Sequence, residues 1–361
     1  MNFLYVSGAN YIYTENAVFK TNAFSREDWE DSFTSTNREF LREFYEYTIR
    51  NPRHGRLIVN KAVVYGRHEH FLWHYDDRMA ELKDMGNWDQ KVWGKWENDS
   101  YRKCWRAIDS WLPPAEKQYT AEKDENLKLF SGNPYGNVDI IPWWGDFSKY
   151  NSIAFLGWNT MNPELLNKLK DYVYHGGTLF ITYCHMNTTD RNDKPPVFID
   201  NTEEFFGVTI AEAVDTYGGL EFMDGFKNKS VDQSLKIVQC TPKTATILAR
   251  DPYNRGIYFL NQFGKGKVYF GAFMDYFSAD WAVQAANHMM SIIGAEGDSY
   301  CNNPNIAFTE RLLSDGSSII HVMNMNCADE NRREKFKLRM GTKVIEDEIE
   351  EGKVYSYKLR K

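Results

Sequence analysis

The chain has 361 residues, which is enough for two or three domains and a large buried core. It carries 43 lysines and arginines against 50 aspartates and glutamates, and this formal charge of -7 argues against a nucleic-acid partner. No apolar run reaches the length of a membrane span and the first residues lack the layout of a signal peptide, so we expect a cytoplasmic protein that binds no membrane.

Cysteine and aromatic content narrow the class of protein further. The five cysteines are scattered without a CxxC pair, which is typical of reduced thiols. Aromatic residues make up 16% of the chain, including 11 tryptophans and 22 tyrosines. In an acidic chain, aromatic rings beyond the needs of the core favour stacking on sugars.

The first elements in chain order are a strand and a helix. The run over residues 3–9 has the composition of a buried strand and leads into a loop that contains Glu15. Apolar residues at three-four spacing then predict an amphipathic helix over about 33–48, which ends before Asn51-Pro52. A lone strand leaves its backbone groups unpaired, so we expect this strand to have neighbours elsewhere.

A parallel sheet is predicted from Leu57 onward. Asn162-Pro163 begins an amphipathic helix that stops at Gly176-Gly177, and a Gly-Lys-Gly turn joins two later strands. Apolar strands without alternation, linked by such a helix, indicate a sheet covered on both faces. The predicted strands are 61–66, 138–142, 152–158 and 178–183, followed by a hairpin over 256–273 and a helix over 281–293.

A tryptophan-rich insertion over residues 68–133 interrupts this sheet, with one expected helix that ends at Pro113-Pro114. Flat rings beside hydrogen-bonding groups suit pyranose sugars. The alternative is that these tryptophans pack the insertion against another domain or subunit. Residues after a strand at the carboxyl edge of a sheet are also cleft candidates. The sugar-binding candidates from both places are Trp73, His74, Trp93, Trp96, Trp143 and Trp144.

Two kinds of active centre are disfavoured by the residues themselves. His68, His70 and His74 lack the carboxylate spacing of a zinc motif, so no metal or other cofactor is expected. Cys184 follows a strand and precedes His185, but the turn lacks the glycines of a nucleophile elbow. We expect Cys184 to be a buried thiol.

From residue 302 onward the chain alternates as an all-β module, with strands around 306–313, 318–325, 335–340 and 353–359. The stretch YNSIAFLGWNTMNPELLNKLKDYVYHGGTLFITYCHMNTT (150–189) resembles the flavodoxin-like, amidotransferase-related domain that follows the barrel in family 42 glycoside hydrolases, the β-galactosidase group. The element formed by Tyr172, Val173, Gly176 and Gly177 carries this resemblance.

The resemblance implies three domains. Residues 1–56 would be the last unit of a (β/α)8 barrel, 57–296 an amidotransferase-like α/β domain with the insertion, and 297–361 a small β-sandwich domain. Barrel enzymes carry catalytic groups after their strands, which makes Glu15 the catalytic candidate and Asn10 and Tyr13 substrate-binding candidates.

Most of the barrel and the second catalytic carboxylate would come from elsewhere. The expected function is therefore the C-terminal part or a subunit of a β-galactosidase-like enzyme, acting on an oligosaccharide or glycoside within a homo- or hetero-oligomer that includes a barrel-bearing subunit. The alternatives are a non-catalytic sugar-binding or oligomer-scaffold protein, and a glutamine amidotransferase.

Overall fold

The structure is a computed structural model, and it describes residues 2–9, 32–66, 104, 106–112, 132–189, 195–228, 233–326 and 333–360. The chain divides into two compact units. Unit 1 consists of Met1–Val59, Pro114–Asn137 and Ser299–Lys361, whereas unit 2 consists of Asn60–Pro113 and Val138–Asp298. No helix in the described ranges combines the length and apolar character needed to cross a membrane.

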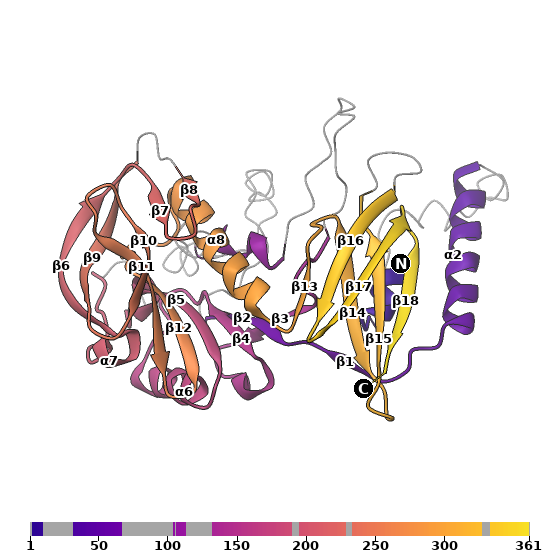
Figure 1. Ribbon diagram of the computed structural model, residues 1–361, viewed down its shortest axis with the longest axis horizontal. Coiled ribbons are helices and arrows are strands. Elements are labelled where there is room, and N and C mark those ends of the chain that lie inside the picture. Colours follow the sequence, from indigo (N-terminus) through magenta and orange to yellow (C-terminus); the bar gives the residue numbers. More distant parts are fainter. Residues whose placement is uncertain are drawn as a thin grey trace, which may run out of the picture. The chain divides into compact units, whose positions relative to one another are not determined.

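Unit 2 is built on a nine-stranded mixed sheet (Figure 1). Five adjacent strands run parallel, and β2 and β4 are buried on both faces, as expected for a sheet with helices on both sides. In sheet order they are β3 (Val138–Pro142), β2 (Lys61–Tyr65), β4 (Ser152–Phe155), β5 (Thr178–Thr182) and β12 (Gly266–Gly271).

The other strands of this sheet are antiparallel, so the prediction of a parallel sheet holds for only part of it. β11 (Gly256–Phe263) folds back on β12 through a turn in which Gly264 has φ +60°. β10 (Thr246–Arg250), β7 (Leu220–Phe222) and β8 (Lys227–Asn228) follow by antiparallel pairing. The short connections from β7 to β8, from β10 to β11 and from β11 to β12 allow only the antiparallel direction, because a parallel return needs a long crossover.

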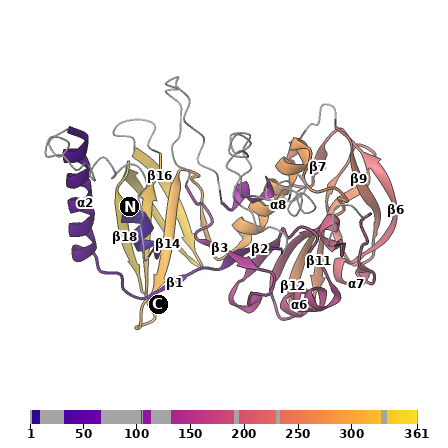
Figure 2. The same ribbon diagram turned by 180° about the vertical axis from the view of Figure 1, so that it is seen from behind.

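A two-stranded ribbon, β6 (Val208–Thr216) and β9 (Leu235–Pro242), lies beside β11 in unit 2 (Figure 2). The sequence predicted no element there. β6 exposes three consecutive residues at its centre, where its pairing with β9 shifts register between Ile210 and Ala213. This bulge breaks the period of two by which a strand is recognised.

The main helices of unit 2 are α6 (Pro163–Tyr174) and α8 (Asp280–Glu296), which lie below and above the strands in Figure 1. The start of α6 is as predicted, because the Asn162 side chain accepts a hydrogen bond from Leu165 N at 2.8 Å. At its end Gly176 takes φ +119°, which also agrees with the prediction. The short helices are α7 (Glu203–Phe206), η4 (Arg106–Ser110), η5 (Phe147–Lys149) and η6 (Tyr183–Met186).

The described part of the tryptophan-rich insertion packs against α8. Of the helix predicted there, the structure describes Cys104, which is helical, and the short 3-10 helix η4, which Trp111 follows. Trp111 is fully buried and its indole N–H donates to the Met290 carbonyl at 2.6 Å. This tryptophan is therefore a core residue of unit 2.

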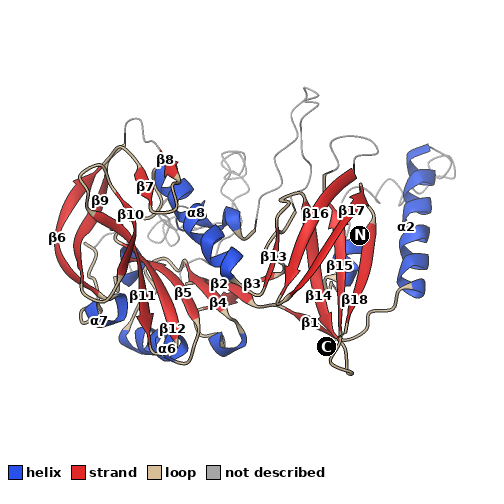
Figure 3. Ribbon diagram, in the orientation of Figure 1, coloured by secondary structure: helices blue, strands red, loops and turns tan. Residues whose placement is uncertain are grey.

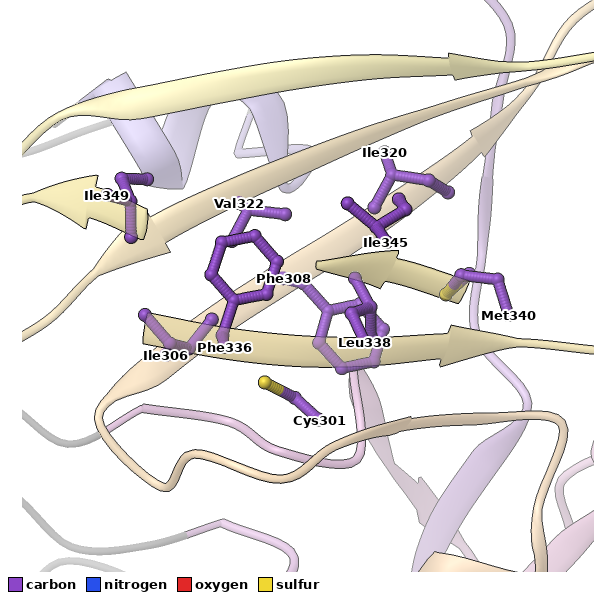
Figure 4. Close-up of a cluster of buried hydrophobic side chains, with 10 residues drawn as sticks. All are labelled: Cys301, Ile306, Phe308, Ile320, Val322, Phe336, Leu338, Met340, Ile345 and Ile349. Atoms are coloured by element: carbon purple, nitrogen blue, oxygen red, sulfur yellow. The ribbon is translucent and has the colours of Figure 1, made fainter. Parts of the chain in front are cut away.

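Unit 1 contains two antiparallel sheets, whose strands are red in Figure 3. The first has the order β1-β14-β15-β18 and the second β13-β16-β17. Buried side chains from both sheets form one core, and Phe308, Val322 and Leu338 are among those that Figure 4 shows facing one another. The strands are β1 (Arg56–Ile58), β14 (Ile306–Leu312), β15 (Ser318–Asn324), β18 (Val354–Leu359), β13 (Ser299–Cys301), β16 (Arg333–Met340) and β17 (Lys343–Glu350).

The predicted strand over residues 3–9 is wrong: Asn2–Val6 form a short helix, α1. Arginine side chains satisfy the carbonyls at its end, since Arg311 donates to Val6 O at 3.2 Å and Arg53 to Ala9 O at 2.9 Å. The helix predicted next does form, as α2 (Ser32–Arg50), and it contacts α1 through the rings of Tyr5 and Phe44. The described residues therefore do not contain the barrel strand that the sequence predicted.

Candidate functional site

The carboxyl edge of the parallel strands holds the two predicted site residues that the structure describes, Trp143 and Trp144. They are the central residues of a tight turn after β3, closed by a hydrogen bond of 2.8 Å from Gly145 N to Pro142 O. Ligands bind open α/β sheets at this edge. The turn therefore presents two adjacent indoles where a ligand is expected.

The rings at this edge form an angular surface that we call the tryptophan edge, consisting of Tyr65, Trp143 and Trp144. The two indoles meet edge to face, with centroids 5.6 Å apart and planes at 88°. Tyr65, the last residue of β2, meets Trp144 at 6.4 Å and 76°. Trp144 is 62% exposed although it is among the largest apolar side chains, so its ring face is available to a ligand.

A lysine from α6 holds this turn from behind. Lys168 Nζ donates to the carbonyl oxygens of Trp143, at 3.4 Å, and Gly145, and it lies 4.1 Å from the centroid of the Phe147 ring. Burial lowers the pKa of the Lys168 ammonium. Because these contacts fix the backbone of both tryptophans, the tryptophan edge is preorganised for binding.

The tryptophan edge also contains a buried polar group, the indole N–H of Trp143. Its Nε1 atom is buried and has no hydrogen-bond acceptor among the described residues. A buried donor of this kind costs free energy unless it finds an acceptor. A sugar hydroxyl or a water at the edge would supply that acceptor.

A second polar cluster follows β4, β5 and β12 at the same sheet edge. The Asn159 side-chain oxygen accepts hydrogen bonds from Asn187 Nδ2 at 2.6 Å and from the Tyr276 hydroxyl at 2.8 Å. Asn159 is buried and has φ +43°, a conformation that Asn tolerates better than most residues. These three side chains lock the connections after three strands to one another.

The thiol of Cys184, in the connection after β5, is buried, as predicted. Thr182 Oγ1 lies 3.0 Å from Cys184 Sγ and 2.8 Å from His185 Nδ1, and both residues are fully buried. Burial raises the pKa of the Cys184 thiol far above its usual range and lowers the pKa of His185 to about 3. A buried thiol beside a neutral imidazole has neither the thiolate nor the access that nucleophilic catalysis needs.

The remaining predicted site residues lie outside the described residues. They are the catalytic candidate Glu15 and the sugar-binding candidates Asn10, Tyr13, Trp73, His74, Trp93 and Trp96. Within the described ranges, no group of three or more His, Cys, Asp or Glu side chains is arranged to hold a metal ion.

Sequence reasoning missed the residues that support the tryptophan edge. Tyr65 ends a predicted strand beside the one that leads to Trp143, so the carboxyl-edge rule would have found it. Lys168 had no such signal, because it reaches the tryptophan edge from helix α6. Tyr276 had none either, because it reaches the cluster of Asn159 and Asn187 from the connection after β12.

Solved family 42 β-galactosidases have a similar fold. A catalytic mutant of a GH42 β-galactosidase from G. stearothermophilus aligns over 93% of this chain and 45% of its own, with a TM-score of 0.53 and 15% identity. A cold-adapted β-galactosidase from Rahnella sp. R3 aligns over 91% and 45%, with a TM-score of 0.50 and 14% identity. No protein-family model matches the chain, and no curated protein sequence matches it.

These neighbours confirm, at the level of fold, the resemblance predicted from the sequence. The chain spans less than half the length of either structure, which agrees with a C-terminal region of a GH42-like protein. At about 15% sequence identity, this structural similarity shows the fold alone, so activity and substrate have to be argued from the site.

Proposed function

We propose that the chain is the non-barrel part, or a subunit, of a family 42-like glycoside hydrolase, and that its tryptophan edge contacts the sugar. The main support is the exposed Trp144 ring, which contacts Trp143 and Tyr65 at the carboxyl edge of the sheet. The fold of the chain is similar to that of part of a β-galactosidase. The carboxylates that cleave the glycosidic bond belong, in this proposal, to a (β/α)8 barrel and to Glu15.

Pyranose binding suits the chemistry of the tryptophan edge. Each sugar ring has an apolar face of C–H groups that packs on an aromatic plane, and its hydroxyls need donors and acceptors nearby. Trp144 offers the plane, whereas the buried Trp143 N–H offers an unused donor. Because the two indoles are perpendicular, a sugar ring could pack on the face of one and contact the edge of the other.

The carboxylates nearest the tryptophan edge in sequence are engaged in hydrogen bonds within the fold. We therefore do not assign glycoside hydrolysis to them. Asp139 accepts a hydrogen bond from the Tyr150 hydroxyl at 2.8 Å, and Asp146 caps Ser148 N at 3.1 Å. Hydrolysis of a glycoside normally needs two carboxyl groups about 5 to 9 Å apart around the scissile bond. In this proposal the chain supplies one of them, Glu15.

A second candidate is an assembly role without catalysis. On α2 the side chains of Leu41, Tyr45 and Ile49 are exposed at i, i+4 and i+8, so they lie along one stripe of the helix. A stripe of this kind is typical of a helix that packs against another surface. In this reading α2 joins the chain to a partner, and the tryptophan edge binds sugar without turnover or belongs to an interface.

Hydrolysis of nitrophenyl β-D-galactopyranoside distinguishes the two candidates. We would assay the purified chain, any barrel-bearing polypeptide encoded beside it, and their mixture. We expect activity in the mixture only, and a fall in kcat/KM of about tenfold or more for Trp144→Ala because an aromatic contact to the sugar is lost. Tyr174→Ala is the matched control, since Tyr174 is equally exposed but ends α6.

The hydrolase proposal fails if the mixture forms no complex and cleaves no glycoside. It also fails if Trp144→Ala retains the kcat/KM of the unaltered chain within a complex that is active.

A further inference from the structure

Two exposed tyrosines, Tyr217 and Tyr253, form a second aromatic cluster in unit 2, which we call the tyrosine site. Tyr217 lies in the connection from β6 to β7, and Tyr253 lies in the turn from β10 to β11. Their rings meet edge to face, with centroids 5.5 Å apart and planes at 81°, and the residues are 55% and 51% exposed. A side-chain hydrogen bond with Tyr217 raises the pKa of Tyr253.

A buried carboxylate holds the Tyr253 turn in one conformation. Asp251 has a fully buried side chain, and it accepts hydrogen bonds from Tyr253 N at 3.0 Å and from Arg255 N at 2.9 Å. The same carboxylate accepts from the Thr216 hydroxyl at 2.9 Å, which ties the turn to the end of β6. These hydrogen bonds thus fix the exposed residues 252–254 between two ends that the buried carboxylate holds.

Arg255 completes the support and leaves one donor unused. Its Nε and Nη2 atoms bind the Asp251 carboxylate at 2.7 and 2.6 Å, and Nη2 also donates to Asp215 O at 2.9 Å. The guanidinium carbon lies 4.7 Å from the centroid of the Tyr253 ring, a cation–π contact. Its third nitrogen, Nη1, makes no hydrogen bond within the part of the chain that the structure describes.

Close backbone packing fixes Tyr217 as well. The next residue, Gly218, has φ +89°, and a Cβ atom there would lie 3.0 Å from the Pro252 ring. Only glycine permits this approach without strain. Both tyrosines therefore sit on backbones that are held before any ligand arrives.

We propose that Tyr217 and Tyr253 form a carbohydrate-binding site that stacks a pyranose ring of an oligosaccharide. The exposed ring face of Tyr217, the face of Tyr253 opposite Arg255, the phenol hydroxyls and the Arg255 Nη1 donor provide the mixture of apolar and polar contacts that a sugar ring requires. The rigid support lowers the entropy lost on binding. The neighbouring exposed residues Asp215 and Asn254 are polar, whereas the centre of a protein–protein interface is depleted of charged side chains.

This site is separate from the tryptophan edge. The sheet order places β10 six strands from β3, and at about 4.8 Å per step this is roughly 30 Å. One monosaccharide cannot contact both places. The tyrosine site would instead hold a distant part of a long glycan, or a second glycan, while the tryptophan edge acts on its own ligand.

Titration of the full chain with lactose, cellobiose and maltose tests the proposal. Ring signals of tyrosines labelled with ¹³C report on the two positions directly, once they are assigned with Tyr217→Phe and Tyr253→Phe. We expect at least one of the three sugars to shift both signals saturably. For Tyr217→Ala/Tyr253→Ala, calorimetry should then show binding of that sugar weakened by about tenfold or more.

Two variants keep the outcome specific. Tyr174→Ala removes an equally exposed ring on α6 and should leave binding at Tyr217 and Tyr253 unchanged. Trp144→Ala should leave the shifts at both tyrosines unchanged, so the tyrosine site stands or falls separately from the proposed hydrolase function. The proposal is overturned if none of the sugars shifts either signal at about 50 mM, a concentration that detects even weak binding. It is also overturned if the double variant loses self-association of the chain but keeps its sugar affinity, because the tyrosine site would then be a protein interface.

Discussion

The Asp251 carboxylate and the Arg255 guanidinium form an ion pair of 2.6 Å in which the aspartate side chain is fully buried and that of the arginine is 24% exposed. Removing the carboxylate of such a pair leaves the arginine side chain, which is mostly buried, without its counter-charge. Asp251→Asn should therefore lower the free energy of unfolding by about 3 kcal/mol, measured by urea denaturation.

An exposed pair of equal length provides the control. Lys337 and Glu346 also lie 2.6 Å apart, but both side chains are more than half exposed. Water screens such pairs, so Lys337→Gln should cost less than about 0.5 kcal/mol. Equal losses for both substitutions would contradict the view that Asp251 is a structural support of the tyrosine site.

Arg311 is expected to hold the N-terminal segment in place. Its guanidinium donates to His54 O at 2.9 Å, Gly55 O at 2.8 Å and Val6 O at 3.2 Å. Lysine cannot reach three carbonyls in this fork geometry. Arg311→Lys should cost about 2 kcal/mol and accelerate amide exchange in residues 2–9, whereas Arg333→Lys, an exposed arginine, should change neither. Unchanged exchange in Arg311→Lys would refute this role.

Stability should fall as the pH drops below 7, in part because of His185. Burial lowers its folded-state pKa to about 3, so the unfolded chain takes up a proton near pH 6.5 that the folded chain does not. The contribution is fully present above pH 6.5 and is lost as the pH falls toward 3. Between pH 7 and pH 5 the unaltered chain should lose about 2 kcal/mol more than His185→Gln, as measured by urea denaturation at each pH. Parallel curves for the two proteins would contradict this assignment.

Cys184 should contribute packing and no chemistry. Because its thiol is buried and its pKa raised, it should resist alkylation by iodoacetamide until the chain is unfolded. Cys184→Ala should lower the free energy of unfolding by about 1 kcal/mol through a small cavity and leave every sugar affinity unchanged. Release of ammonia from glutamine by the unaltered chain, lost in Cys184→Ala, would support the amidotransferase alternative instead.

The parts of the fold that were predicted correctly have local causes. Helix α6 begins at an Asn-Pro cap and ends at a glycine pair, and both signals lie within the segment itself. The hairpin of β11 and β12 likewise turns at Gly264. Such elements are visible in the sequence because their ends depend on few distant contacts.

The errors arose where distant residues decide the structure. The run over residues 3–9 has no clear period, and its helical form depends on Arg53 and on Arg311, which is some three hundred positions away. The cluster of Asn159, Asn187 and Tyr276 assembles from the ends of three strands, so only the sheet order reveals it. The position of Trp143 and Trp144 after a strand was predictable, whereas the angle between their rings was not.

Lactose titration observed at the indole N–H groups of Trp143 and Trp144 tests the central claim most directly. The two signals are assigned by Trp143→Phe and Trp144→Phe in ¹⁵N-labelled protein. We predict that both signals shift with one saturable dissociation constant, and that the Trp143 N–H signal changes most because its donor gains an acceptor. If neither signal moves while lactose rises to about 50 mM, the tryptophan edge does not bind this sugar and the proposed role in glycoside recognition is wrong.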